Sequence, residues 1–137
     1  MPYHVCYYHV VWATKNREPL ITPQIEPIVI AAIRRKSETL RSPVLAINTV
    51  ADHIHIAVSI TLTVSVADWV KHVKGVSAYE VNNTFPDMPS RFSWQSGYSV
   101  LTFGEQGRKE VLGYIERQKE HHRENSLMAS LERFDDN

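Results

Sequence analysis

The sequence predicts an α+β fold: a ferredoxin-like antiparallel sheet with helices on one face and a further helix at the C-terminus. Its 137 residues are 43% hydrophobic, which is enough for the core of one domain of ordinary size. Stretches of β-branched and aromatic residues alternate with stretches that carry apolar residues at helical spacing. Their order is strand, helix, strand, strand, helix, strand, helix, which is typical of a sheet covered by helices. We therefore expect one domain over residues 1–125 and a loosely held tail over residues 126–137.

The opening strand and the first helix are predicted from the first 40 residues. Residues 3–14 are rich in β-branched and aromatic side chains and contain neither glycine nor proline, which favours a long strand. Thr22 followed by Pro23 has the cap-then-proline form of a helix start. Apolar residues then recur at helical spacing until about Leu40, so we expect an amphipathic helix there.

A hairpin and a second helix come next. Two β-rich runs, residues 44–50 and 53–60, are separated by only two residues, which predicts an antiparallel pair of strands. Ser65 followed three residues later by Asp68 resembles a capping box. An apolar stripe continues from there toward Asn82, so we expect a second amphipathic helix that begins at this cap.

The last third of the chain predicts a loop, a strand and a final helix. Residues 83–95 contain two prolines and favour a loop, whereas residues 97–103 are β-rich and end at a glycine. A helix is expected from about residue 107 to residue 125. Its basic residues cluster near its C-terminal end, where the helix dipole favours positive charge.

Composition restricts the classes of function. The single cysteine excludes an internal disulfide framework and a cysteine-based zinc cluster, which leaves histidine, carboxylate and amide groups as possible metal ligands. Fifteen basic residues balance fifteen acidic ones, whereas nucleic-acid binders are usually basic, so composition alone does not indicate DNA. The N-terminus has no basic-then-apolar leader, and no apolar run approaches the roughly 18 residues of a membrane span. We therefore expect a cytoplasmic protein.

Two histidines stand two residues apart in the second strand of the predicted hairpin. Side chains alternate between the faces of a strand, so His53 and His55 point the same way while Ile54 and Ile56 fill the opposite face. Two neighbouring imidazoles can converge on one divalent ion, although a tightly held ion also needs a third protein ligand. The alternative is a pair of exposed histidines on an open sheet face.

The predicted C-terminal helix carries a tyrosine and a glutamine four residues apart. On a helix, this spacing places Tyr114 and Gln118 one turn apart on the same face. A glutamine amide oxygen is a neutral, hard donor suited to Mg²⁺ or Mn²⁺. A phenol with a pKa near ~10 is a poor nucleophile at neutral pH, but an ion that lowers the charge of a nearby phosphate would help it. The alternative is a tyrosine whose ring packs on the sheet edge with its hydroxyl in water.

Four motifs occur in a characteristic order: Tyr8–Lys15 with the following Asn16 and Arg17, Asp52–His55, Lys71–Ser77, and Tyr114–Gln118. In this order, over about residues 3–125, they resemble the HUH single-strand transposases with one catalytic tyrosine. That family includes the two-hundred-type insertion-sequence transposases and the related REP-associated tyrosine transposases. The ordered set is far more specific than the pair of histidines alone.

The resemblance implies a metal-dependent DNA transposase that forms an obligate dimer, with the tyrosine helix of each subunit completing the metal site of the other. Carried over residue by residue, His53, His55 and Gln118 would bind Mg²⁺ or Mn²⁺, and Tyr114 would be the nucleophile. Such enzymes recognise hairpins at element ends and cleave single-stranded DNA. They hold the 5′ end as a phosphotyrosine and release a 3′ hydroxyl. The implied location is the prokaryotic nucleoid.

Basic and aromatic side chains are candidates for holding the DNA. The four basic candidates are Lys15, Arg17, Lys71 and Lys74. The two lysines of the second helix are three residues apart and are expected on its solvent side. Phe92 and Trp94 in the proline-containing loop could stack on single-stranded bases, or could equally belong to the core.

Three other functions remain open from the sequence. A domesticated dimer could bind DNA or RNA hairpins without cutting them, but a binder needs neither the tyrosine nor the metal ligands. A related HUH nickase would be expected to carry a helicase or a second adjacent tyrosine. A small-molecule-sensing ferredoxin-like domain would leave Tyr114 and Gln118 unexplained. His121 and His122 could replace Gln118 as the third ligand or could simply be helix-end cations.

Overall fold

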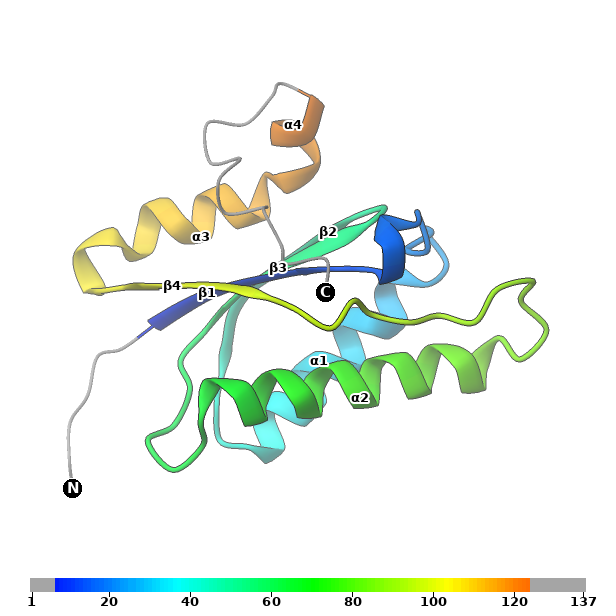
Figure 1. Ribbon diagram of the computed structural model, residues 1–137. Helices are drawn as coiled ribbons and strands as arrows, with labels where there is room; N and C mark the ends of the chain where they lie inside the picture. Colours follow the sequence, from blue (N-terminus) through cyan, green and yellow to red (C-terminus); the bar gives the residue numbers. More distant parts are fainter. Residues whose placement is uncertain (1–6, 124–137) are drawn as a thin grey trace.

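A computed structural model of the chain describes residues 7–123, with side chains described as far as residue 120 (Figure 1). Its sheet has four antiparallel strands in the order β2-β3-β1-β4, which confirms the α+β prediction. The strands are β1 (Tyr7–Ala13), β2 (Val44–Val50), β3 (His53–Val58) and β4 (Ser99–Phe103). The helices are α1 (Glu26–Thr39), α2 (Val66–Thr84), α3 (Arg108–Glu116) and α4 (Gln118–Arg123), with single 3-10 turns at Lys15–Arg17 and Glu105–Gly107.

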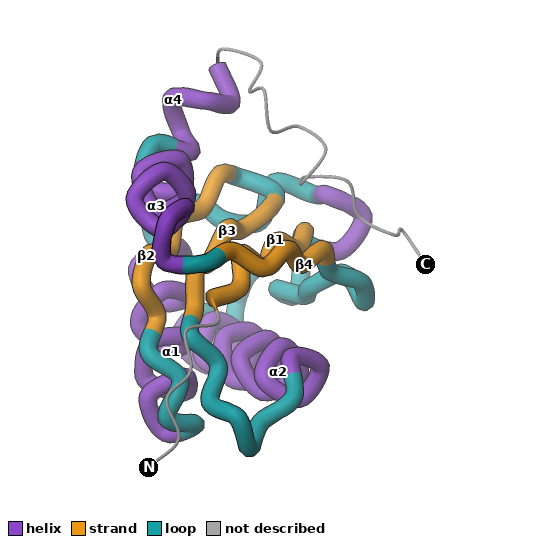
Figure 2. The backbone as a smooth tube through the Cα atoms, turned by 90° about the vertical axis from the view of Figure 1, so that its left-hand side faces the viewer, coloured by secondary structure: helices purple, strands orange, loops and turns teal. Residues whose placement is uncertain are grey.

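The elements form three layers. Helices α1 and α2 pack side by side on one face of the sheet, and α3 lies across the other face over β2 and β3 (Figures 1 and 2). The main core fills the space between the sheet and the α1–α2 layer, and a smaller apolar cluster lies beneath α3. In the described part of the chain, no helix is long and apolar enough to cross a membrane.

Strand register decides which side chains face each layer. In β3, Ile54 and Ile56 point into the main core, as the alternation of the sequence predicts. His53 and His55 alternate with these isoleucines and pair with Ala13 and Val11 of β1. Both histidines therefore face the α3 side, where His55 contacts Tyr114. The strand that carries the predicted site is therefore central in the sheet and has a partner on each side.

The helix boundaries differ from the predicted ones in the first helix. The regular part of α1 begins at Glu26, but Thr22 makes the predicted cap contact. Its hydroxyl accepts a hydrogen bond from the Ile25 backbone N–H at 3.3 Å, and its carbonyl oxygen accepts one from the Glu26 N–H at 2.9 Å. The cap of α2 is confirmed, since the Ser65 hydroxyl accepts from the Asp68 backbone N–H at 3.0 Å.

The predicted continuous helix from residue 107 to 125 is wrong. The backbone leaves helical geometry at Arg117 (φ −102°, ψ 20°), so α3 ends at Glu116 and α4 starts at Gln118. The side-chain amide of Asn48 donates to the carbonyl oxygens of Ile115 and Glu116, at 3.2 and 3.1 Å. These carbonyls are thus satisfied from β2 at the helix end rather than by further helix.

Candidate active site

The two histidines of β3 lie beneath α3 rather than on an open sheet face. His53 and His55 are both 0% exposed, and their ring centroids are 5.2 Å apart. Because β3 is a central strand, the positions of both rings are fixed by backbone pairing on either side. The exposed-pair alternative therefore does not describe this protein.

Tyr114 is the side chain through which α3 meets these histidines. It is 6% exposed, and its ring centroid lies 5.8 Å from that of His55 in an edge-to-face arrangement. It packs together with Ile115 on Ala46 and Ala57, two small residues that let the helix approach the sheet closely. His55 and Tyr114, 59 positions apart in the chain, are thus brought into contact.

Gln118 lies at the start of α4 and is 0% exposed. Neither its amide oxygen nor its amide nitrogen has a hydrogen-bond partner among the described residues. Leaving a buried amide unsatisfied costs about 1–3 kcal/mol, so such a group is retained where something outside the chain satisfies it. Its oxygen fits a hard divalent cation. Because of the break at Arg117, Gln118 does not share one continuous helix face with Tyr114.

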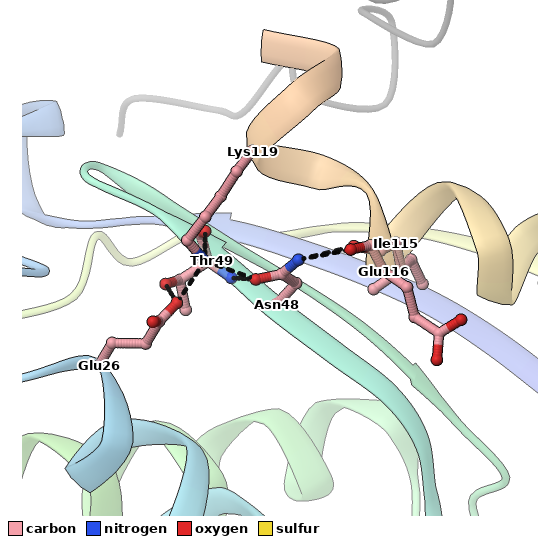
Figure 3. Close-up of polar contacts among 6 residues, drawn as sticks. All are labelled: Glu26, Asn48, Thr49, Ile115, Glu116 and Lys119. Carbon is pink, nitrogen blue, oxygen red and sulfur yellow. Dashed lines mark hydrogen bonds and ion pairs between the residues drawn. The ribbon is translucent and has the colours of Figure 1, made fainter. Parts of the chain in front are cut away.

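The break between α3 and α4 is held in place by polar contacts from two other elements (Figure 3). Lys119 donates to Glu26 Oε2 at 2.6 Å, to Asn48 Oδ1 at 2.8 Å and to the Thr49 carbonyl oxygen at 3.0 Å. Burial alone would raise the pKa of Glu26, but hydrogen bonds from Lys119 and Thr49 outweigh it, and the net shift is downward. The residues on both sides of the break are therefore anchored to α1 and β2.

Each histidine of β3 also has a side-chain partner at its Nδ1 atom. His53 Nδ1 lies 2.8 Å from Asp52 Oδ1, and the other carboxylate oxygen of Asp52 forms an ion pair with Arg17 Nε at 3.4 Å. The hydrogen bond with His53 is the main reason that the pKa of Asp52 is lowered. His55 Nδ1 lies 3.0 Å from Nε2 of His9, a buried residue of β1 that was not among the predicted site residues.

No group of three His, Cys, Asp or Glu side chains in the described part of the chain is placed to hold a metal ion. The predicted ligands His53, His55 and Gln118 are not a group of this type, because the third ligand is an amide. The side chains of His121 and His122 fall outside the described part.

Comparison with known proteins identifies the family. The model of the family described as "Transposase IS200 like" matches residues 2–118. The chain belongs to this family. Of two relatives of this IS200-like transposase, the ISDra2 transposase TnpA of Deinococcus radiodurans is 26% identical over 115 residues, which cover 81% of this chain and 82% of the relative. The transposase for insertion sequence element IS200 of Salmonella typhimurium is 29% identical over 119 residues, covering 84% and 78%.

Two solved structures resemble this IS200-like transposase. The crystal structure of a candidate transposase from Deinococcus radiodurans has a TM-score of 0.69 at 27% identity, covering 85% of this chain and 93% of that one. A REP-associated tyrosine transposase bound to a REP hairpin has a TM-score of 0.62 at 13% identity, covering 89% and 72%. At that identity the second likeness concerns the fold alone.

The basic candidates for DNA binding in this IS200-like transposase fall into two groups. Lys15 and Arg17 line a pocket of about 640 Å³ together with the loop of residues 93–96. Lys71 is exposed on α2, as predicted. Lys74 is not on the solvent side, because it is half-buried and its ammonium donates to the carbonyl oxygens of residues 95, 96 and 97 at 2.7, 3.3 and 3.0 Å.

The two aromatic candidates also separate. Phe92 is 1% exposed and belongs to the main core, so it presents no face to a nucleic acid base. Trp94 is half-buried, donates from its indole N–H to the Ser77 hydroxyl at 2.9 Å and lines the pocket beside Lys15.

Burial of Lys74 lowers its pKa to about 8, so the group that holds the pocket loop is still largely protonated at neutral pH.

Proposed function

We propose that this IS200-like transposase cleaves and rejoins single-stranded DNA, with Tyr114 as the nucleophile. His53, His55 and Gln118 would bind a divalent ion, Mg²⁺ or Mn²⁺. The observation that carries this function is the buried Gln118 amide without a partner in the described residues, next to a helix that sets Tyr114 against His55. A protein that only binds hairpins has no use for this combination.

The side chains present fit such an ion. Two imidazoles and an amide oxygen are neutral donors, so they leave the charge of the ion available to a phosphate. When bound, the ion would neutralise and polarise the scissile phosphate. The burial of all three side chains excludes water from the site and strengthens each electrostatic interaction within it.

Tyr114 would carry out the covalent step. Its phenolic oxygen attacks the scissile phosphorus and loses its proton, the bond between phosphorus and the 3′ oxygen breaks, and that 3′ oxygen takes up a proton. The product is a 5′-phosphotyrosine and a free 3′ hydroxyl. Attack by another 3′ hydroxyl on the same phosphorus reverses the step and releases the tyrosine, so rejoining needs no external energy source. The contacts at the helix break support this role because they fix the position of α3 on the sheet that it covers.

The DNA strand would pass the pocket beside β1. Lys15 supplies an exposed positive charge at its rim, and Trp94 supplies an aromatic surface within it. Arg17 would contact the DNA from the same pocket, where its side chain also forms the ion pair with Asp52. Lys71 would contact the DNA backbone from α2, while Lys74 would shape the pocket by fixing the loop of residues 95–97.

The proposed partners are hairpin DNA and a second copy of the chain. Hairpin DNA is proposed by analogy with the solved REP-associated tyrosine transposase of similar fold, which is bound to a REP hairpin. A homodimer is supported by the edge strand β4, which exposes Val100 and Leu101 (38% and 53%). In this single chain, α3 lies on its own sheet, and exchange of α3 between subunits is part of the proposal. Such an enzyme would act at the nucleoid, in the cytoplasm.

A covalent-adduct assay tests this function. The protein is incubated with labelled single-stranded hairpin DNA and Mg²⁺ or Mn²⁺, and denaturing gels are inspected for a DNA–protein adduct. We expect an adduct that disappears on chelation and in Tyr114→Phe. Tyr79→Phe is the matched control, because Tyr79 is 66% exposed on α2.

Two outcomes would contradict this function. An adduct in Tyr114→Phe would show that another group is the nucleophile. Hairpins that bind tightly, with no adduct from any of them, would support the alternative of a noncatalytic hairpin-binding dimer.

A further inference from the structure

His9 is a buried histidine that the proposed reaction does not use. It lies on β1, is 2% exposed, and its Nε2 atom is 3.0 Å from Nδ1 of His55. Its ring centroid is 5.2 Å from that of His55 and 6.1 Å from that of Tyr114. In the sheet register His9 is opposite Ala57, whose small side chain leaves space for the imidazole to reach the neighbouring His55.

The hydrogen bond between the two neutral rings allows two arrangements. If the proton is on His55 Nδ1, His9 accepts it, and Nε2 of His55 has a lone pair that can bind a metal ion. If the proton is on His9 Nε2, His55 Nδ1 accepts it, and His55 carries its own proton on Nε2. The second arrangement prevents His55 from binding an ion through Nε2. The choice of tautomer in this pair therefore decides whether His55 is a ligand.

His53 shows the same geometry with a partner that leaves no choice. A carboxylate can only accept, so the 2.8 Å contact with Asp52 requires the proton on His53 Nδ1. Arg17 Nε lies 3.4 Å from the other carboxylate oxygen of Asp52 and forms an ion pair with the ionised group. Nε2 of His53 then faces the site as an acceptor. Because Nδ1 of each ring already has a partner, both rings would bind the ion through Nε2 and both need the proton on Nδ1, but only His53 has a carboxylate that enforces this tautomer.

We propose that His9 is the positioning residue for His55: it accepts the Nδ1 proton and thereby holds the ring in the tautomer and orientation that present Nε2 to the ion. Asp52 does the same for His53. This role rests on the metal ligation proposed above, and it adds a residue from β1 to a site otherwise built from β3, α3 and α4. Partners of this kind commonly contribute 10- to 100-fold to metal affinity.

Nitrogen NMR of the histidine rings tests the tautomer directly and without metal. At a pH where both imidazoles are neutral, we expect the wild-type protein to carry the His55 proton on Nδ1. In His9→Leu, which cannot accept, we expect the proton to move to Nε2. His9→Gln offers an amide oxygen as acceptor and should restore the Nδ1 proton. A wild-type protein with the proton on His55 Nε2 would overturn the role of His9 before any variant is made.

Mn²⁺ affinity, measured by calorimetry, gives the second readout. We expect about a 10- to 100-fold loss in His9→Leu and recovery of most of that affinity in His9→Gln. His72→Leu, an exposed histidine of α2, should bind Mn²⁺ like wild type. Equal affinity in His9→Leu and wild type would contradict the role of His9. Loss in both His9 variants would show that ring packing, not acceptance of the proton, is what matters.

Failure of the ligand assignment itself has a different signature. If His55→Ala binds Mn²⁺ as tightly as wild type, His55 is not a ligand, and the proposed function is wrong at that residue. The NMR measurement still decides the tautomer of the pair in that case, because it is made on the metal-free protein.

Discussion

At the scale of single residues, Gln118 is the side chain whose burial conflicts most clearly with stability and is best explained by its proposed role as a metal ligand. Complete burial of an amide that no described residue satisfies is unfavourable for the folded chain alone. Such sites are expected where a protein retains a group for a ligand. Removal of the amide should therefore affect stability and ligand binding in opposite directions.

We predict that Gln118→Met raises the free energy of unfolding in the absence of metal by about 1 kcal/mol. Methionine is similar in size to glutamine, and the change removes a buried unsatisfied amide. Thermal unfolding with and without Mn²⁺ measures both the metal-free stability and the stabilisation by the ion. Wild type should be stabilised by Mn²⁺, by about 2.7 kcal/mol at a concentration 100 times the dissociation constant, and the variant much less.

Gln24→Met is the matched control, because Gln24 is exposed and should change neither property. A metal-free Gln118→Met protein that is less stable than wild type would mean that the amide is satisfied in the folded chain. Equal stabilisation of both proteins by Mn²⁺ would remove Gln118 from the ligand set.

Lys74 provides a pH-dependent prediction at the same scale. Burial lowers the pKa of its ammonium to about 8, whereas the unfolded chain keeps a value near ~10.4. Between these values the unfolded state binds more protons than the folded state, so the free energy of unfolding contributed by this group increases with pH. Urea unfolding of wild type and Lys74→Met should show wild type gaining stability relative to the variant between pH 8 and pH 10. A constant difference would show that the three carbonyl contacts maintain the ordinary pKa.

At the scale of elements, the junction of α3 and α4 is the feature that places both Tyr114 and Gln118. The helix break needs partners for the last carbonyls of α3, and Asn48 of β2 supplies them. Lys119 then binds back to Asn48 and to Glu26, which ties the start of α4 to the same strand and to α1 (Figure 3). The register of β2 therefore controls the position of Tyr114, the proposed nucleophile.

We predict that Asn48→Ala lowers the free energy of unfolding by about 1–3 kcal/mol, because it leaves helix-end carbonyls and the Lys119 ammonium short of partners. Hydrogen exchange should increase at the amides around residues 114–120, and the yield of covalent adduct should fall. Asn83→Ala is the control, since Asn83 is exposed near the end of α2. Unchanged exchange in α3 and α4 would show that apolar packing alone holds these helices.

The sequence predicted the type of most elements but not this junction. Apolar spacing in residues 107–125 fits one helix, and nothing local marks Arg117 as an end. The competing partner, Asn48, comes from a strand that is 67 residues away from Ile115. Local propensity is a weak determinant when a tertiary contact can satisfy the same backbone groups.

At the scale of the whole molecule, the net charge of zero requires that DNA binding arise from local charge. Lys15 and Arg17 at the pocket, and Lys71 on α2, concentrate positive charge near the end of β1 and the loop before β4. Binding of this kind depends on the few phosphates contacted and not on the overall field of the protein.

We predict that Lys15→Ala weakens binding to hairpins of any sequence and reduces the slope of log affinity against log salt concentration by about 1. Fluorescence anisotropy over a range of salt concentrations measures the slope. Arg34→Ala is the control, because Arg34 is exposed on α1, which contributes no residue to the pocket. An unchanged slope in Lys15→Ala, or an equal reduction in Arg34→Ala, would place the DNA elsewhere.

The fold class, the order of elements and the shared face of His53 and His55 can all be predicted from the sequence alone. These depend on periodicity and on short-range chemistry, which one strand or helix carries within itself. The sequence also placed Tyr114 and Gln118 among the residues of interest, through motifs in a fixed order.

Which of these side chains contact one another, and which contact other parts of the chain instead, follows from the tertiary structure. It buried the histidines beneath α3, turned Lys74 inward to hold a loop, and brought His9 from β1 within hydrogen-bond distance of His55. Each of these contacts joins segments far apart in the chain. They arise from strand register and helix packing, which depend on all the layers at once and leave no local signal in the sequence.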